Sequence, residues 1–135
     1  VLSLGHSPLL VPNSLVNENN TDTLEKYLHE FEPMGILISG GNDIGQYSSR
    51  DRTEACIYTW AIENELPILG ICRGMQMIGL LNGSRLKKVN GHVKTSHKVR
   101  MLSNNNESIK NSYHLFSLTD CPKNFEVTFV SKKLM

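Results

Sequence analysis

Short apolar runs alternate with helical patterns through the first half of the chain, and this alternation restricts the possible folds more than any other feature of the sequence. The runs are Pro8–Pro12, Gly35–Ser39 and Pro67–Ile71. All three are interpreted as buried strands, and the third is continuous and not alternating, as in parallel strands that are covered on both faces. The helical patterns are Thr23–Phe31, Asp51–Glu65 and a third from Arg73 to Leu81. The alternation predicts an α/β fold, a three-layer sandwich with a mostly parallel central sheet.

The second half of the chain has a different pattern of apolar and polar residues. Two β-like runs, His97–Leu102 and Phe125–Val130, are separated by polar loops. At 135 residues, the chain is expected to form one domain that spans residues 1–135. Because the sequence opens on Val1 and closes on Met135 soon after a strand-like run, we expect this domain to be truncated at both ends.

The net charge is only +1, but the basic residues concentrate in the second half of the chain. The stretch from Arg85 to Arg100 holds no acidic residue. It is interpreted either as a solvated face or as an anion site for a phosphorylated substrate, with Lys94 and Lys98 as the contacts. Because the stretch lacks interleaved aromatic residues, no nucleic-acid partner is expected.

Three widely spaced cysteines, Cys56, Cys72 and Cys121, form no Cys-x-x-Cys pair. Neither a disulfide framework nor a metal site is therefore expected, and the predicted location is a reducing cytoplasm. Cys56 lies on a helical apolar stripe and is expected in the core, whereas Cys121 precedes Pro122 and is expected at a turn. No apolar run approaches the ~20 residues of a membrane helix and no signal peptide opens the chain, so no membrane association is expected.

The segment Leu69–Gln76 carries the strongest chemical signal. A strand is expected to end at Ile71 and a helix to begin near Arg73, which leaves Cys72 at a sharp turn between glycines. Such a turn projects its side chain, as in a nucleophile elbow. A helix N-terminus stabilises a thiolate, and the next backbone N–H can meet a developing oxyanion. Cys72 is therefore predicted to be a nucleophile and not a buried structural cysteine.

Gly40 and Gly41 follow the second apolar run, at the strand end where ligands bind in open parallel sheets. A Gly-Gly turn lets backbone N–H groups approach a substrate oxygen, and beside Cys72 it is interpreted as the second half of an oxyanion hole. Asp51 and Glu54 have the spacing of a capping box. Glu54 is interpreted either as that cap or as support for the active site.

These segments resemble the class I glutamine amidotransferase family, and specifically its γ-glutamyl hydrolase branch. The resemblance is carried by Gly35–Asp43, Arg50–Glu54 and Pro67–Gln76, with further matches at Val11–Asn13 and Asn111–His114. It implies a flavodoxin-like fold and no metal or organic cofactor.

The resemblance also implies a role for particular residues. Cys72 becomes the nucleophile, the backbone N–H groups of Gly41 and Arg73 line the oxyanion hole, and Gln76 helps to hold the γ-glutamyl group. The full set implied for the oxyanion hole and substrate binding is Gly40, Gly41, Arg73, Gln76, Asn111, Ser112, Tyr113 and His114.

The sequence departs from this family at two places. The family completes its catalytic triad with a histidine and a glutamate two residues later, but no histidine follows His114, so both residues are expected beyond Met135. His114 itself is interpreted either as an in-chain base or, because the family places its base elsewhere, as a loop histidine that shapes the substrate pocket. Leu115-Phe116 replaces a common His-Gln pair. Together with the motif over Ser39–Asp51, this replacement resembles a bacterial sub-branch encoded with surface-polysaccharide genes. Some members of that sub-branch are thought to release glutamate from γ-glutamyl-linked nucleotide amidates.

The expected function is therefore the hydrolysis of a small γ-glutamyl amide through a thioester on Cys72. Two alternatives stay open at this point. One is a glutaminase subunit that delivers ammonia to a synthase partner. The other is a non-catalytic binding module on the same scaffold.

Overall fold

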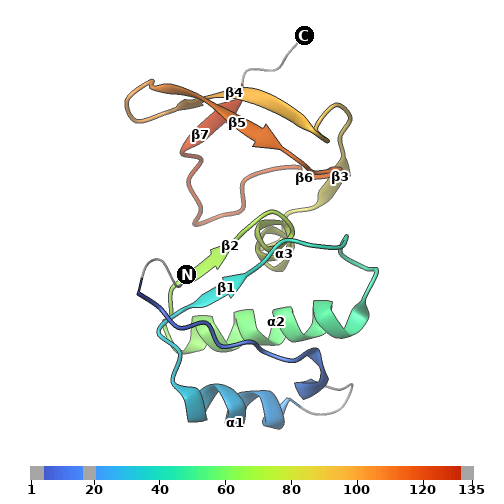
Figure 1. Ribbon diagram of the computed structural model, residues 1–135, viewed down its shortest axis with the longest axis vertical. Helices are drawn as coiled ribbons and strands as arrows, with labels where there is room; N and C mark the ends of the chain where they lie inside the picture. The colour runs from blue at the N-terminus through green and yellow to red at the C-terminus, as the bar shows by residue number, and fades with distance from the viewer. Residues whose placement is uncertain (1–4, 17–20, 132–135) are drawn as a thin grey trace. The chain divides into compact units, whose positions relative to one another are not determined.

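The computed structural model describes residues 5–16 and 21–131, and it is drawn in Figure 1. The chain divides into two compact units, an N-terminal unit (Val1–Met77) and a C-terminal unit (Ile78–Met135). The single domain over residues 1–135 stays a prediction.

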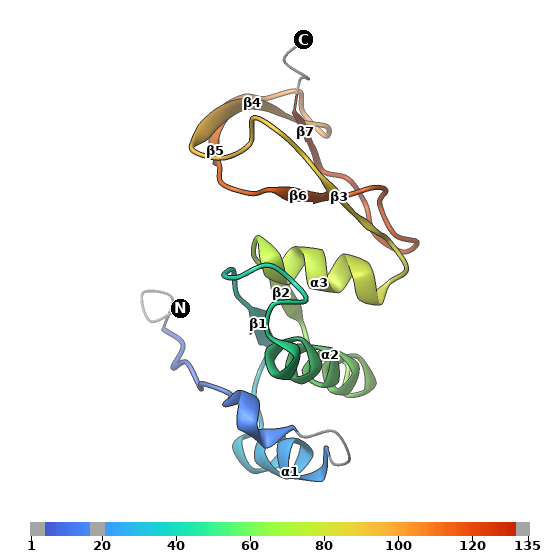
Figure 2. The same ribbon diagram turned by 90° about the vertical axis from the view of Figure 1, so that its right-hand side faces the viewer.

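The N-terminal unit contains a parallel strand pair and the helices that precede and follow its strands. Its elements are η2 (Asn13–Leu15), α1 (Asp22–Phe31), β1 (Ile36–Ile38), α2 (Ser48–Glu63), β2 (Ile68–Gly70) and the start of α3 (Arg73–Leu81). β1 and β2 pair in parallel, with Ile36 opposite Ile68 and Ile38 opposite Gly70. Helix α2 lies between α1 and this strand pair (Figure 2). The predicted alternation of strands and helices is thus confirmed from residue 22 to residue 81.

Two expectations for the N-terminal unit are wrong. Pro8–Pro12 forms no strand, and a short 3-10 helix, η2, follows it instead. Proline lacks the N–H that a strand ladder needs, and this run has one at each end. The second error concerns the start of α2, which begins at Ser48, so Asp51 lies inside its first turn and does not cap it.

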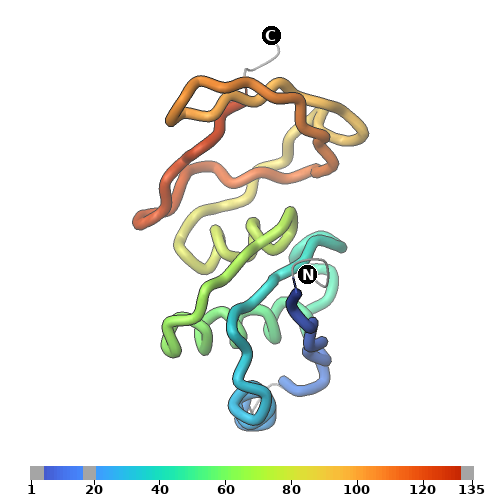
Figure 3. The backbone as a smooth tube through the Cα atoms, turned by 60° about the vertical axis from the view of Figure 1, so that its left-hand side comes forward, coloured from blue at the N-terminus to red at the C-terminus, as the bar shows by residue number. Residues whose placement is uncertain are grey.

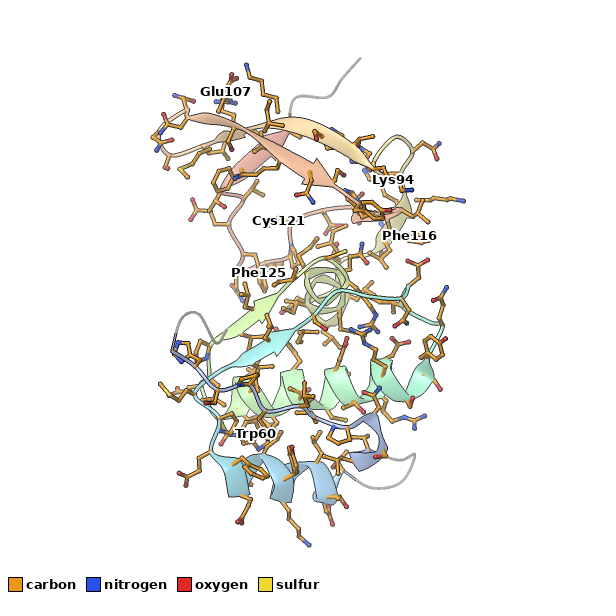
Figure 4. The ribbon with its side chains drawn as sticks, in the orientation of Figure 1. Trp60, Lys94, Glu107, Phe116, Cys121 and Phe125 are labelled. Carbon is orange, nitrogen blue, oxygen red and sulfur yellow. The ribbon has the colours of Figure 1, made fainter. Side chains whose placement is uncertain are left out.

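The core of the N-terminal unit forms where α1 packs against α2. Buried side chains of α1, Leu24 and Leu28, pack with Ile57, Trp60 and Ala61 of α2. Leu24 and Leu28 are four residues apart and therefore lie on one helix face. Trp60 points from α2 toward α1 (Figure 4), where its ring meets His29 edge-on at 5.5 Å. Cys56 packs against this cluster but is only half-buried.

The C-terminal unit is built from short antiparallel strands. They are β3 (Leu86–Lys88), β4 (Thr95–Met101), β5 (Glu107–Ser112), β6 (Phe116–Leu118) and β7 (Phe129–Ser131). β3 pairs with β6, and β4 lies between β5 and β7. Figure 3 shows the β4 and β5 segments running side by side. The strand predicted at His97–Leu102 is confirmed within one or two residues.

The strand predicted over Phe125–Val130 begins only at Phe129. The start of the predicted run belongs to a turn instead, in which the Phe125 N–H donates to the Pro122 carbonyl oxygen (3.2 Å) and Asn124 lies in the left-handed region at φ +69°. Parallel pairing is limited to β1 and β2 among the described strands, since both other sheets are antiparallel. In the described part of the chain, no helix combines the length and apolar character needed to span a membrane.

Candidate active site

Cys72 lies at the turn between β2 and α3, as the sequence predicts. Its φ is +55°, in the left-handed region, and its side chain is exposed. This conformation costs a residue with a Cβ about 1–2 kcal/mol, so the surrounding hydrogen bonds must hold it. The Ile71 N–H donates to the Ile38 carbonyl oxygen (2.9 Å), and the Gln76 N–H donates to the Cys72 carbonyl oxygen (3.1 Å). The strained strand–turn–helix expected around Cys72 is therefore confirmed.

Gly74 lets the start of α3 approach β1. A Cβ at this position would overlap the carbonyl oxygen of Ile38 and lie 2.6 Å from its carbonyl carbon. Both are backbone atoms of a paired strand and cannot rotate away. Only glycine therefore permits α3 to begin where it does, directly after Cys72.

The Gly-Gly loop (Ser39–Asn42) leaves β1 beside Cys72. A Cβ on Gly40 would lie 3.4 Å from the Cβ of Cys72 and 4.0 Å from its Sγ. The two glycines and the cysteine come from different strand ends, and parallel pairing of β1 with β2 brings them together. The predicted juxtaposition of the loop and the cysteine turn is thus present in the structure.

Arg50 holds this loop from the first turns of α2. Its Nη2 donates to the carbonyl oxygens of Ser39 (3.2 Å) and Gly40 (3.1 Å), and its Nη1 donates to Oδ1 of Asn42 (2.9 Å). Its Nε donates to Oε1 of Glu54 (2.8 Å). The sequence assigned no role to the Arg50 side chain, because contacts between residues about ten positions apart leave no periodic signal.

Arg73 and the α2 carboxylates complete an arginine–carboxylate network (Arg50, Asp51, Glu54 and Arg73). The Arg73 guanidinium, 2% exposed, donates from Nη2 to Asp51 and from Nη1 to Glu54. Glu54 therefore accepts hydrogen bonds from both arginines, one on each oxygen. Of its two interpretations, the cap is wrong and support for the site fits the contacts. The Arg73 backbone N–H is the first of α3, a position with no acceptor inside the helix.

The ion pairs of the buried Arg73 side chain with Asp51 and Glu54 predict an effect on stability. Arg73→Met should lower the free energy of unfolding by about 3 kcal/mol, because it leaves the poorly exposed Glu54 and Asp51 carboxylates without one of their cationic partners. The measurement is urea unfolding followed by circular dichroism.

The matched control is Lys98→Met, which breaks an ion pair with Glu107 whose lysine is 58% exposed. An exposed pair should contribute less than about 1 kcal/mol. A loss in Arg73→Met as small as that expected for Lys98→Met would contradict a stabilising role for the buried pairing.

The other predicted site residues lie in the C-terminal unit. Asn111 and Ser112 end β5, where they pair with Ser96 and Thr95 of β4, and Tyr113 is 61% exposed in the following loop. Ser112 is buried. These positions form the end of β5 and the loop that follows it, and their contact with a substrate stays a prediction.

Ser112 and His114 are both tied to His92. The Ser112 hydroxyl and the His114 N–H each donate to the His92 carbonyl oxygen, at 2.9 and 3.0 Å. The His92 ring lies 4.5 Å from that of His97 and 4.9 Å from that of His114, centroid to centroid. Partial desolvation, followed by the neighbouring His114 and His97, lowers the pKa of His92. No group of three metal-ligating side chains suited to a metal ion occurs among the residues that the structure describes.

Of the two lysines expected at an anion site, Lys98 lies on β4 and Lys94 comes directly before it. Lys98 is paired with the Glu107 carboxylate, so its charge is already matched. Lys94 precedes β4 and lies at the opposite end of the β4–β5 pair from Glu107 (Figure 4). The anion site stays a prediction, and the Lys98–Glu107 pair weakens it.

Gln76 is buried on α3, one helical turn beyond Cys72. With Gly40, Gly41 and Arg73, it belongs to the set of predicted residues that the N-terminal unit gathers around the cysteine turn.

Comparison with known proteins agrees with this geometry. The family described as glutamine amidotransferase class-I matches residues 2–135. The chain therefore belongs to the class I glutamine amidotransferase family, as the resemblance implied.

Three curated relatives illustrate the range of the family. The chain is 30% identical over 135 residues to the carbamoyl phosphate synthase small chain of Wigglesworthia glossinidia brevipalpis, a match that covers 97% of this chain and 33% of the relative. It is 33% identical over 89 residues to the γ-glutamyl-CDP-amidate hydrolase of Campylobacter jejuni, covering 62% and 43%. It is 31% identical over 86 residues to a glutamine-hydrolysing GMP synthase subunit of Methanococcus maripaludis, covering 64% and 42%. The chain thus spans less than half the length of each of these relatives.

A solved structure supports the fold. A protein from Thermoplasma acidophilum, described as a GMP synthase subunit, matches with a TM-score of 0.58 and 23% identity, over 72% of this chain and 51% of that one. At this identity the likeness concerns the fold alone, and it supports the α/β class.

Proposed function

We propose that the protein hydrolyses a γ-glutamyl amide through a thioester on Cys72. The Cys72 thiolate adds to the γ-carbonyl carbon, and the C–N bond breaks as the leaving nitrogen takes up a proton. Water then adds to the thioester carbonyl, and the C–S bond breaks to release glutamate and the free thiol. The resemblance assigns the proton transfers to a histidine and a glutamate outside residues 1–135, so the experiments use the full-length protein.

One observation carries this proposal above the others: an exposed cysteine held at φ +55° between a strand and a helix, with Gly40 packed beside it. A thiol in this position is accessible to a substrate carbonyl. The N–H groups of Gly41 and Arg73 are proposed to donate to the oxyanion that forms on the γ-carbonyl oxygen.

The proposal also assigns the binding of the substrate. Gln76 would contact the γ-glutamyl group. The loop from Asn111 to His114 would contact the substrate as well, and no metal or organic cofactor takes part. The relative from Campylobacter jejuni is named a γ-glutamyl-CDP-amidate hydrolase, and this name favours a nucleotide amidate over glutamine as the substrate. We also propose a cytoplasmic location. The proposed fold is a three-layer sandwich with a mostly parallel central sheet, and the parallel pairing of β1 with β2 supports it.

A second candidate is a glutaminase subunit that supplies ammonia to a synthase. The relatives named as a carbamoyl phosphate synthase small chain and as a glutamine-hydrolysing GMP synthase subunit favour it. The same thioester chemistry would then act on glutamine, and activity would depend on the synthase partner.

Glutamate release from a substrate panel tests the proposal and separates the two candidates. The purified protein is assayed with glutamine, with γ-glutamyl alkylamides and with a γ-glutamyl nucleotide amidate. A hydrolase should release glutamate unaided and prefer a substituted amide. Activity on glutamine alone that requires an added synthase partner would favour the second candidate, and no turnover of any substrate would contradict both.

Thiol alkylation provides a further prediction. Cys72 should react with iodoacetamide faster than the other two cysteines near neutral pH, because it is exposed at the start of α3. Burial raises the pKa of the half-buried Cys56 thiol, which should slow its reaction. The measurement is a short labelling pulse followed by peptide mass spectrometry.

Cys121 serves as the internal control for exposure. It is also exposed, and its Sγ donates to the Phe125 carbonyl oxygen at 3.4 Å (both residues are labelled in Figure 4). Labelling of Cys121 at the rate of Cys72 would show that exposure alone sets reactivity and would argue against an activated turn.

A further inference from the structure

We propose that Arg50 is a positioning residue for the Gly-Gly loop, and that Glu54 holds the guanidinium groups of Arg50 and Arg73 against helix α2. This inference rests on the proposed function, since its catalytic consequence requires Gly41 to be an oxyanion donor. It assigns a function to side chains of α2 that touch neither the thiol nor, by the proposal, the substrate.

The contacts of Arg50 are directed at the loop backbone. Its Nη2 donates to two successive carbonyl oxygens, those of Ser39 and Gly40, and its Nη1 donates to the side chain of Asn42. These bonds flank Gly41 on both sides. A planar guanidinium can satisfy several acceptors in one fixed geometry, whereas an ammonium group is a single point charge.

Gly41 packs closely against the Arg50 guanidinium group. A Cβ on Gly41 would overlap Nη1 of Arg50, so the loop backbone and the guanidinium occupy complementary space. Gly41 also has φ +148°, a conformation that favours glycine. The Arg50 side chain therefore restricts the orientation of the Gly41 peptide.

Glu54 contacts both Arg50 and Arg73. Its Oε1 accepts from Nε of Arg50 at 2.8 Å, and its Oε2 accepts from Nη1 of Arg73, the residue that follows Cys72. Asp51 also accepts from Arg73 and, through its other oxygen, from the Gly45 N–H at 2.8 Å. A single helix, α2, thus holds both proposed sources of oxyanion N–H groups.

The charges in this network argue against an alternative role in substrate binding. Two guanidinium groups face two carboxylates, so the arginine–carboxylate network has no uncompensated positive charge to offer a substrate carboxylate. Glu54 is buried and Arg50 is only 19% exposed. The network is arranged to fix the backbone.

The test replaces Arg50 by lysine, which keeps the positive charge but lacks the planar guanidinium group with its several N–H donors. In the full-length protein, Arg50→Lys should lower kcat for γ-glutamyl amide hydrolysis by roughly 100-fold, the range expected for a displaced oxyanion donor, with KM little changed. The amide protons of residues 40–42 should exchange with solvent about tenfold faster. The rate of Cys72 alkylation should stay at the parental value, since alkylation needs no oxyanion hole.

Arg52→Lys makes the same chemical change at the neighbouring arginine of α2, and it should leave both kcat and loop exchange near the parental values. If Arg50→Lys does not fold, Asn42→Ala removes the acceptor of Nη1, together with the hydrogen bond from Asn42 Nδ2 to the Asp43 carbonyl oxygen (3.0 Å), and should give a smaller change of the same kind.

Parental kcat and parental exchange in Arg50→Lys would overturn the inference while leaving the proposed function in place. A fall in kcat together with an equal fall in Cys72 alkylation would also overturn it, because the cysteine turn and not the loop would then be disturbed. If the parent protein hydrolyses no γ-glutamyl amide, the proposed function fails. The exchange rates would still report whether Arg50 orders the loop.

Discussion

Cys72→Ser is expected to abolish γ-glutamyl amide hydrolysis while the protein stays folded. A serine hydroxyl is a far weaker nucleophile than a thiolate at neutral pH, and the loss of a nucleophile typically lowers kcat by about 10⁵–10⁶-fold. The change replaces one sulfur atom by oxygen at an exposed position, so packing should be little affected. Glutamate release and circular dichroism spectra of the two proteins provide the measurement.

Cys121→Ser is the matched control for this prediction. It makes the same atomic change at another exposed cysteine, one that lies in the C-terminal unit, and it should retain the parental rate. Residual activity of Cys72→Ser within about tenfold of the parent would exclude the thioester route, since a removed nucleophile costs far more.

Gly74→Ala should have a large effect on stability. Alanine is favoured over glycine inside a helix by about 1 kcal/mol, so propensity alone predicts a gain. The added methyl group would instead overlap the Ile38 carbonyl group and force α3 away from β1. We expect a net loss of about 3 kcal/mol in the free energy of unfolding, together with loss of activity, because the turn at Cys72 must move.

The control is Gly83→Ala, just beyond the end of α3. Gly83 has φ +86° but open space around it, so alanine there should cost only the backbone term of about 1–2 kcal/mol. Urea unfolding of both variants gives the comparison. A Gly74→Ala protein at least as stable as the parent would mean that α3 does not need this close approach.

The elements with strong periodicity could be predicted from the sequence. The Leu24/Leu28 spacing predicted α1, and the apolar runs that end at Ser39 and Ile71 predicted β1 and β2. The sequence failed where proline or a turn competes with an apolar run. Pro8 and Pro12 deny the first run its ladder donors, and the turn at Asn124 delays β7.

The candidate site was predicted in part. The glycines around Cys72 indicated its strained turn, because a short loop between a strand and a helix has few possible geometries. The side-chain roles of Arg50 and Arg73 were missed, since they depend on contacts between residues eight to 22 positions apart. The spacing of Arg50, Asp51 and Glu54 was a usable signal, but it was interpreted in part as a helix cap.

Detection of the covalent intermediate tests the thioester on Cys72 most directly. The full-length protein is mixed with a γ-glutamyl amide, quenched in acid within the first turnovers, and analysed by intact-mass and peptide mass spectrometry. The thioester route predicts a mass increase of one γ-glutamyl group on the peptide that carries Cys72, and this adduct should be sensitive to hydroxylamine and absent from Cys72→Ser. Rapid glutamate release with no adduct on Cys72, or an adduct on Cys56 or Cys121, would contradict it.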